Sequence, residues 1–156
     1  MKIMLSEDAI PCGYFNERWI LFLWKDAVRD QLQSMENKGA IEKVPIGEPY
    51  EWCHPLVIVS KKESNESRIT VDLTVLNKFV KRPAYPTRVP REVVPGFPPG
   101  MTFLPTLDSR HGYWQIPLDE ASSKLSTFMS PWGAFRFKRR VVGLVSVGDD
   151  TQSSHR

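Results

Sequence analysis

The stretch from Thr106 to Leu118, TLDSRHGYWQIPL, holds the residues whose types and spacing best suit chemistry. An apolar run ends there at a single acidic residue, Asp108, and a glycine-containing turn with an aromatic pair follows. A carboxylate at the end of a strand suits a divalent cation, because hard cations prefer oxygen ligands held on rigid elements. A strand-end aspartate that caps a helix beginning at Ser109 explains the same spacing, so both interpretations stay open at this point.

The composition is that of one globular domain of 156 residues, 41% of them apolar. Its 21 basic and 18 acidic residues leave a charge of +3, which permits a nucleic-acid partner without requiring one. Cys12 and Cys53 form no CxxC pair and no zinc spacing, which predicts free thiols in a reducing compartment. We expect an intracellular protein, cytoplasmic or nuclear, not secreted and without a membrane partner, because no signal peptide or spanning segment is evident. The oligomeric state is not indicated.

The hydrophobic pattern predicts an α+β fold. Asp26 as N-cap, apolar residues at helical spacing and Gly39 as the terminal glycine predict an amphipathic helix. An extended loop is expected over 41–55, and a hairpin from strands 56–60 and 68–73 around a polar tip. A proline-rich extended connector then leads to a short acid-led helix at 119–124 and a second hairpin from strands 125–129 and 134–138.

Basic residues gather in two places. The first, over residues 78–91, contains five basic side chains and no acidic one. The second is the strand around residues 136–140, where arginine and lysine alternate with phenylalanine. Contact with nucleic-acid phosphates is the functional interpretation of both clusters, and solubilising charge on a linker is the alternative for the first.

An ordered series of motifs carries a family resemblance over residues 25–143. KDAVRDQLQSMENKGAIEKV, WCHPLVIVSKK, RITVDLTVLNKFVKRPAYP and TLDSRHGYWQIPLDEASSKLSTFMSPWGAFRFKR together resemble the N-terminal part of the reverse transcriptase of gypsy-type LTR retrotransposon Pol polyproteins. The resemblance implies the fingers, residues 25–100, and a partial palm, residues 101–156, of a right-hand polymerase. Residues 1–24 form a poorly defined upstream segment that the pattern does not place.

The resemblance also implies site residues. Asp108 matches the palm aspartate that binds Mg²⁺ and acts in catalysis, because two cations clamp the attacking and leaving oxygens of phosphoryl transfer. The implied partners are an RNA or DNA primer-template and an incoming deoxynucleoside triphosphate, and Tyr113 matches the residue beneath its sugar. The other triphosphate-binding positions are Lys61, Arg68, Ser109 and Arg110. Nucleic-acid contacts are expected from Lys78, Lys81, Arg82, Arg136, Lys138, Arg139 and Gly143.

The sequence departs from the family pattern at three points. The family usually has an arginine after a VDY-like triplet, but this chain has VDLT, with Leu73 and Thr74. Where the family has an MPFG-like run, this chain has Arg140-Val141-Val142-Gly143, without the proline. The second metal-binding motif, Tyr-x-Asp-Asp, is not in the sequence, and Gly148-Asp149-Asp150 follows Asp108 too closely to replace it. We therefore expect a fragment of an RNA-directed DNA polymerase that is inactive alone. The alternatives are a nucleic-acid-binding module without chemistry and a remnant that does not fold stably.

Overall fold

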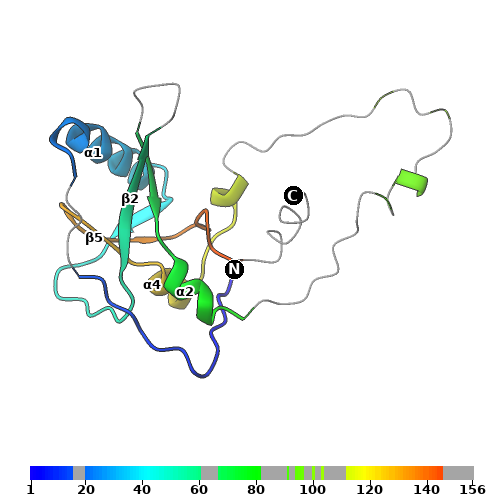
Figure 1. Cartoon of the computed structure of the whole chain (residues 1–156), viewed down its shortest axis with the longest axis horizontal. Coiled ribbons are helices and arrows are strands. Elements are labelled where there is room, and N and C mark those ends of the chain that lie inside the picture. The colour runs from blue at the N-terminus through cyan, green and yellow to red at the C-terminus, as the bar shows by residue number, and fades with distance from the viewer. Residues whose placement is uncertain are drawn as a thin grey trace.

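The computed structural model describes residues 1–15, 20–60, 67–81, 91, 94–96, 100, 103 and 112–145 (Figure 1). Its helices are α1 (Phe22–Asn37), α2 (Thr74–Phe79) and α4 (Glu120–Leu125), with 3₁₀ turns η1 (Val94–Gly96) and η2 (Gly112–Gln115). Its strands are β1 (Ile41–Lys43), β2 (His54–Ser60), β3 (Ser67–Val71), β4 (Phe128–Ser130) and β5 (Gly133–Phe137).

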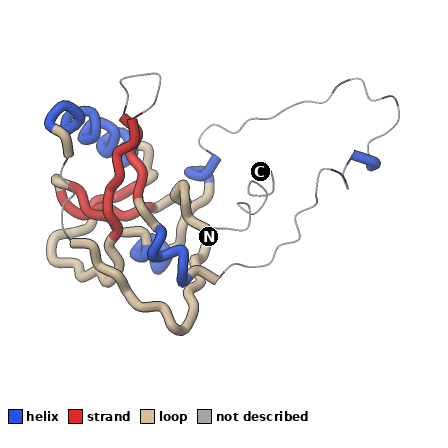
Figure 2. The backbone as a smooth tube through the Cα atoms, in the orientation of Figure 1, coloured by secondary structure: helices blue, strands red, loops and turns tan. Residues whose placement is uncertain are grey.

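The five strands form one sheet in the order β1-β5-β4-β2-β3. Neighbouring strands are antiparallel except for β2 and β4, which are parallel. Figure 2 shows the strands together with helices on either side of them, so the predicted α+β fold is confirmed. Strands β4 and β5, which the sequence assigns to the partial palm, pair with β2 and β1 of the predicted fingers. The division of the chain near residue 100 stays a prediction.

Helix α1 lies against the sheet, in contact with β1 and β3 (Figure 1). Its apolar stripe is buried as the spacing predicted, with Val28 and Leu32 almost inaccessible. The side-chain oxygen of Gln31 also accepts a hydrogen bond from the backbone N–H of Ile69 at 3.2 Å, which occupies a donor on the outer strand β3. The helix ends before Gly39, whose φ of +65° suits glycine. The prediction of Asp26 as N-cap was wrong, because the helix begins four residues earlier, at Phe22.

The centre of the core is aromatic. Phe128 on β4 contacts Phe135 and Phe137 on β5, with ring centroids 6.0 and 5.3 Å apart. Phe135 and Phe137 are buried because alternate residues of a strand point to the same face. The residue between them, Arg136, therefore points to the opposite face.

Residues 1–15, part of the upstream segment that the sequence leaves unplaced, pack on the body of the protein. The backbone N–H of Ile3 donates to the hydroxyl of Ser122 on α4 at 2.7 Å. The carbonyl of Met4 accepts from the N–H of Lys81 at 2.7 Å, just after α2, and the segment then reaches Cys53 at the start of β2. The segment thus connects three elements that are distant in sequence.

Three elements differ from what the sequence predicted, because the residues around each give no clear pattern for it. Strand β1 lies in a segment that was expected to be loop. The strand was missed because it is three residues long and its partner β5 lies more than 90 residues later. Helix α2 was not predicted, because its six residues carry too few turns for a clear period. The strand expected from Leu125 begins at Phe128 instead, because Leu125 ends helix α4. Both hairpins and the acid-led helix are confirmed.

Candidate nucleic-acid interface

The described residues include only part of the predicted site. Outside them lie Asp108, Lys61, Ser109, Arg110 and Arg82. Within them lie Arg68, Lys78, Lys81, Tyr113, Arg136, Lys138, Arg139 and Gly143. The interface is therefore built from the segment that follows β5 and from its two neighbours, η2 and α2.

Tyr113, the predicted sugar-contacting residue, lies in η2 with an arginine over its ring. The guanidinium carbon of Arg140 is 5.0 Å from the centroid of Tyr113, the distance of a cation–π contact. The Tyr113 residue remains 40% exposed, so the contact with Arg140 does not bury it. Sequence reasoning did not predict this pairing, because the two residues lie on elements separated by α4 and the second hairpin.

The segment after β5 is held along residues 116–118 by backbone hydrogen bonds. The N–H of Leu118 donates to the carbonyl of Lys138 at 2.8 Å, and the N–H of Arg140 donates to the carbonyl of Ile116 at 2.8 Å. A bridge between Pro117 and Arg139 lies between these two bonds. The contact of Arg140 with Tyr113 is therefore backed by a fixed backbone.

Gly143 follows in a turn that only glycine adopts readily. Its φ is +91°, and a Cβ built on it would meet no atom within 4 Å. Gly143 and its neighbour Val142 are exposed. The peptide backbone is thus accessible at this turn, as a close approach by a ligand requires.

A side chain from α2 holds this turn in place. The amide nitrogen of Asn77 donates to the carbonyl of Gly143 at 2.8 Å, and its amide oxygen accepts from the N–H of Val145 at 2.9 Å. Sequence reasoning assigned no role to Asn77, although it lies within the quoted VLN run of the family motif. The next residue on the helix, Lys78, is exposed, as is Lys81 just beyond it.

Arg136 has a structural role that the sequence did not reveal. Its guanidinium donates to Glu42 and Glu48 at 2.6 Å each, and its side chain is only 13% exposed. Burial opposes ionisation of Glu42, but hydrogen bonds from Arg136 and Lys138 outweigh burial and lower the pKa of Glu42. The nitrogen of Lys138 lies 3.3 Å from Glu42 while half of its side chain stays exposed. The guanidinium of Arg136 is therefore bound to Glu42 on β1 and to Glu48 in the loop that follows β1.

The VDLT departure places a threonine at the first position of α2, where it binds Asp72. The carboxylate of Asp72 accepts from the backbone N–H of Thr74 at 3.0 Å and from its hydroxyl at 2.5 Å. The first turn of α2 therefore satisfies one of its backbone donors through Asp72. These two bonds join Asp72 to the start of the helix that carries Asn77 and Lys78.

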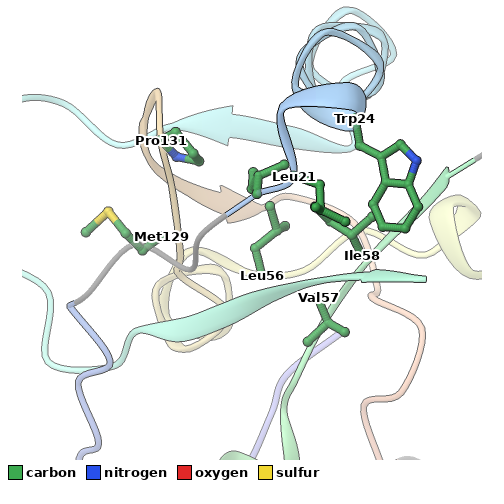
Figure 3. Close-up of a pocket in the computed structure, with 8 residues that line it drawn as sticks. Leu21, Trp24, Leu56, Val57, Ile58, Met129 and Pro131 are labelled. Carbon is green, nitrogen blue, oxygen red and sulfur yellow. The ribbon is translucent and has the colours of Figure 1, made fainter. Parts of the chain in front are cut away.

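An apolar pocket of about 300 Å³ lies elsewhere, between the start of α1 and strands β2 and β4 (Figure 3). It is lined by Leu21 just before α1, Trp24 from α1, Leu56 and Ile58 from β2, and Met129 and Pro131, and no lining residue is charged. A pocket of this chemistry does not suit a nucleotide.

In the part of the chain that the structure describes, no three His, Cys, Asp or Glu side chains group to hold a metal ion. No described helix is long and apolar enough to cross a membrane.

Comparisons with known proteins give related sequences and a related fold, although no family model matches the chain. The chain is 27% identical over 120 residues to the retrovirus-related Pol polyprotein from transposon 412 of Drosophila melanogaster. It is 29% identical over 121 residues to the Pol polyprotein from transposon 297 of the same species. The matches cover 74% and 75% of this chain, which spans about a tenth of those polyproteins, 10% and 11%.

Solved structures with a similar fold are also those of a reverse transcriptase. The foamy viral protease-reverse transcriptase in complex with double-stranded DNA matches with a TM-score of 0.65 and 15% identity, over 92% of this chain and 26% of that chain. A second structure, the dRH form of that protein with double-stranded DNA, gives a TM-score of 0.63 and 14% identity over 96% and 24%. The fold is therefore that of the fingers and palm region of reverse transcriptases, and the sequence is similar to retrotransposon Pol polyproteins.

Proposed function

We propose that this chain is the primer-template-binding part of an RNA-directed DNA polymerase of the gypsy-type LTR retrotransposon class. The observation that carries the proposal is the agreement of 92% of the chain with a reverse transcriptase fold that was solved with double-stranded DNA. The described surface suits the same ligand, because Lys78 is exposed beside Asn77, which binds the open Gly143 turn. Exposed lysines supply the phosphate contacts on which such binding depends.

The proposed nucleotide site combines Tyr113 and Arg68 with residues that lie outside the described ranges. Tyr113 lies beneath the sugar of the incoming deoxynucleoside triphosphate, where its ring excludes a 2′-hydroxyl, and Arg140 contacts that ring. Arg68 is exposed on β3 and binds the triphosphate together with Lys61, Ser109 and Arg110. Asp108 binds Mg²⁺, whose chemistry is to stabilise the charge of phosphoryl transfer.

A second candidate function is nucleic-acid binding without catalysis. It is favoured by the exposed Lys78 and Lys81 and the accessible Gly143 turn, which suit phosphate contact and require no chemical step. The two candidates share the binding surface and differ in chemistry. Primer extension with Mg²⁺ and four deoxynucleotides separates them: extension that Asp108→Asn abolishes supports a polymerase, and its absence while binding persists supports a binding module.

Binding is tested by fluorescence anisotropy with a labelled RNA–DNA primer-template between 50 and about 200 mM salt. Lys78→Ala and Lys81→Ala should each weaken binding and reduce the salt slope by about 1, because each removes one phosphate contact. Lys38→Ala is the matched control, since Lys38 is an exposed lysine at the end of α1, outside the proposed surface. Absence of binding by the unmodified chain at low salt would overturn the proposal.

A further inference from the structure

Asn77 joins two segments that are 66 residues apart in the chain. Its side-chain nitrogen reaches the carbonyl of Gly143 and its side-chain oxygen reaches the N–H of Val145. Among ordinary side chains of this length, only a carboxamide offers a donor and an acceptor side by side at neutral pH. Asn77 is therefore suited to fix the turn on both sides of Leu144.

The turn needs such support. Gly143 has a φ of +91° and no atom within 4 Å of the position where a Cβ would lie, so packing does not restrain it from that side. Its neighbour Val142 is 54% exposed. In contrast, Leu144 is buried and anchors the far side of the turn. The hydrogen bonds of Asn77 thus act where packing is weakest.

The base from which Asn77 acts is firmly held. The carboxylate of Asp72 accepts hydrogen bonds from the N–H and hydroxyl of Thr74 at the start of helix α2, and Leu76, next to Asn77, is completely buried. Lys78, on the other side of Asn77, is exposed. Helix α2 therefore carries both the side chain that holds the Gly143 turn and an exposed cation.

We infer that Asn77 is a positioning residue that aligns the open backbone of the Gly143 turn with Lys78, so that both contact one strand of bound nucleic acid. The inference rests on the proposed function and adds a residue to it. Asn77 acts through the turn and makes no chemical step itself. Loss of its two hydrogen bonds should weaken primer-template binding while the fold remains.

Two substitutions separate the hydrogen bonds from charge. Asn77→Leu is neutral and removes both bonds, and it should weaken binding about tenfold at pH 7.5. Asn77→Asp keeps the shape but turns the donor into an acceptor that repels the Gly143 carbonyl, and protonation of the new carboxyl restores the donor. Its binding deficit relative to the unmodified chain should therefore shrink as the pH falls from 7.5 towards 5. Asn37→Asp, the same change at the exposed end of α1, should show no comparable deficit.

The exchange rate of the Val145 amide hydrogen gives a readout that does not depend on nucleic acid. Asn77→Leu should speed this exchange at least about tenfold, because the amide loses its acceptor. Faster exchange with weaker binding supports the inference. An unchanged exchange rate would mean that Asn77 does not hold the Val145 amide, and it would overturn the inference.

Faster exchange with unchanged binding would overturn the positioning role and leave the proposed function intact. Failure of the unmodified chain to bind would instead overturn the proposed function, and the positioning role with it. Circular dichroism and thermal unfolding verify that Asn77→Leu is folded. If Asn77→Leu does not fold, the pH dependence of the Asn77→Asp binding deficit decides, with the unmodified chain measured at each pH for comparison.

Discussion

The guanidinium of Arg136 and the carboxylate of Glu42 face each other across paired positions of β5 and β1, joined by a 2.6 Å hydrogen bond. Glu48 receives a second bond from the same guanidinium. An arginine of a basic strand thus attaches a short edge strand and its following loop to the sheet.

Replacement of Arg136 should therefore destabilise the fold. Arg136→Ala leaves two partly buried carboxylates side by side without their shared cation, and we expect a loss of about 1 to 3 kcal/mol in the free energy of unfolding. Urea denaturation followed by circular dichroism measures the loss. Lys124→Ala breaks only the exposed pair with Glu120 and should change stability by less than about 0.5 kcal/mol. Equal effects of the two substitutions would contradict the structural role of Arg136.

Stability should also fall in mild acid because of His54. Burial lowers the pKa of His54 below the ordinary value of 6.5, although its hydrogen bond with the Leu125 carbonyl and the charge of Asp72 act in the opposite direction. The unfolded chain therefore binds a proton more readily than the folded one. The stabilisation is complete above pH 6.5 and is lost as the pH falls from there through the lower folded pKa.

The measurement is the urea midpoint between pH 7.5 and 5, compared with His54→Gln, which retains a donor for the Leu125 carbonyl. The variant should have a flatter profile in this window. Parallel profiles would assign the acid sensitivity to other groups.

The thiol of Cys53 should be unreactive in the folded protein. Burial raises its pKa to about 11, so about one molecule in a thousand carries the thiolate at pH 8. In a Cys12→Ser background, iodoacetamide should label Cys53 only after denaturant is added, as mass spectrometry would detect. Cys12 is less buried, and in the Cys53→Ser background it serves as the comparison. Rapid native labelling of Cys53 would be inconsistent with its buried position.

A side chain at position 143 should strain the turn. Gly143→Ala places a Cβ on a backbone with φ of +91°, at an expected cost of about 1 to 3 kcal/mol in folding free energy. Gly96→Ala is the matched control, because Gly96 is exposed, has no positive φ and has open space around it. Thermal unfolding compares the two variants. An unaffected Gly143→Ala would mean that the turn relaxes to another conformation.

Local patterns predicted the elements whose signals lie within one stretch of chain. The stripe of Val28 and Leu32 and the two hairpins depend on neighbouring residues, and the structure confirms them. What the sequence did not reveal is non-local. Strand β1 exists because β5 pairs with it, and the first residues are ordered through Ser122 and Lys81, far along the chain.

The candidate site divides in the same way. Motif resemblance indicated Tyr113, Lys78 and Gly143 by their places in the chain, but could not indicate what surrounds them. The contact of Arg140 with Tyr113 and the bonds of Asn77 to the Gly143 turn arise from tertiary packing. The predicted role of Arg136 in binding omitted Glu42 and Glu48, because acidic residues 94 and 88 positions earlier carry no local signal.

The strand order β1-β5-β4-β2-β3 has a consequence for synthesis on the ribosome. When β3 has emerged, β2 and β3 are the only two neighbouring strands that can already pair. Strand β1 and the other edge of β2 pair only with β5 and β4, within residues 128–137, which are synthesised later. Contacts of such long sequence separation form slowly and leave apolar surface open in the meantime. We therefore expect the nascent chain to need chaperone protection until β5 leaves the exit tunnel and fills the gap between β1 and β4.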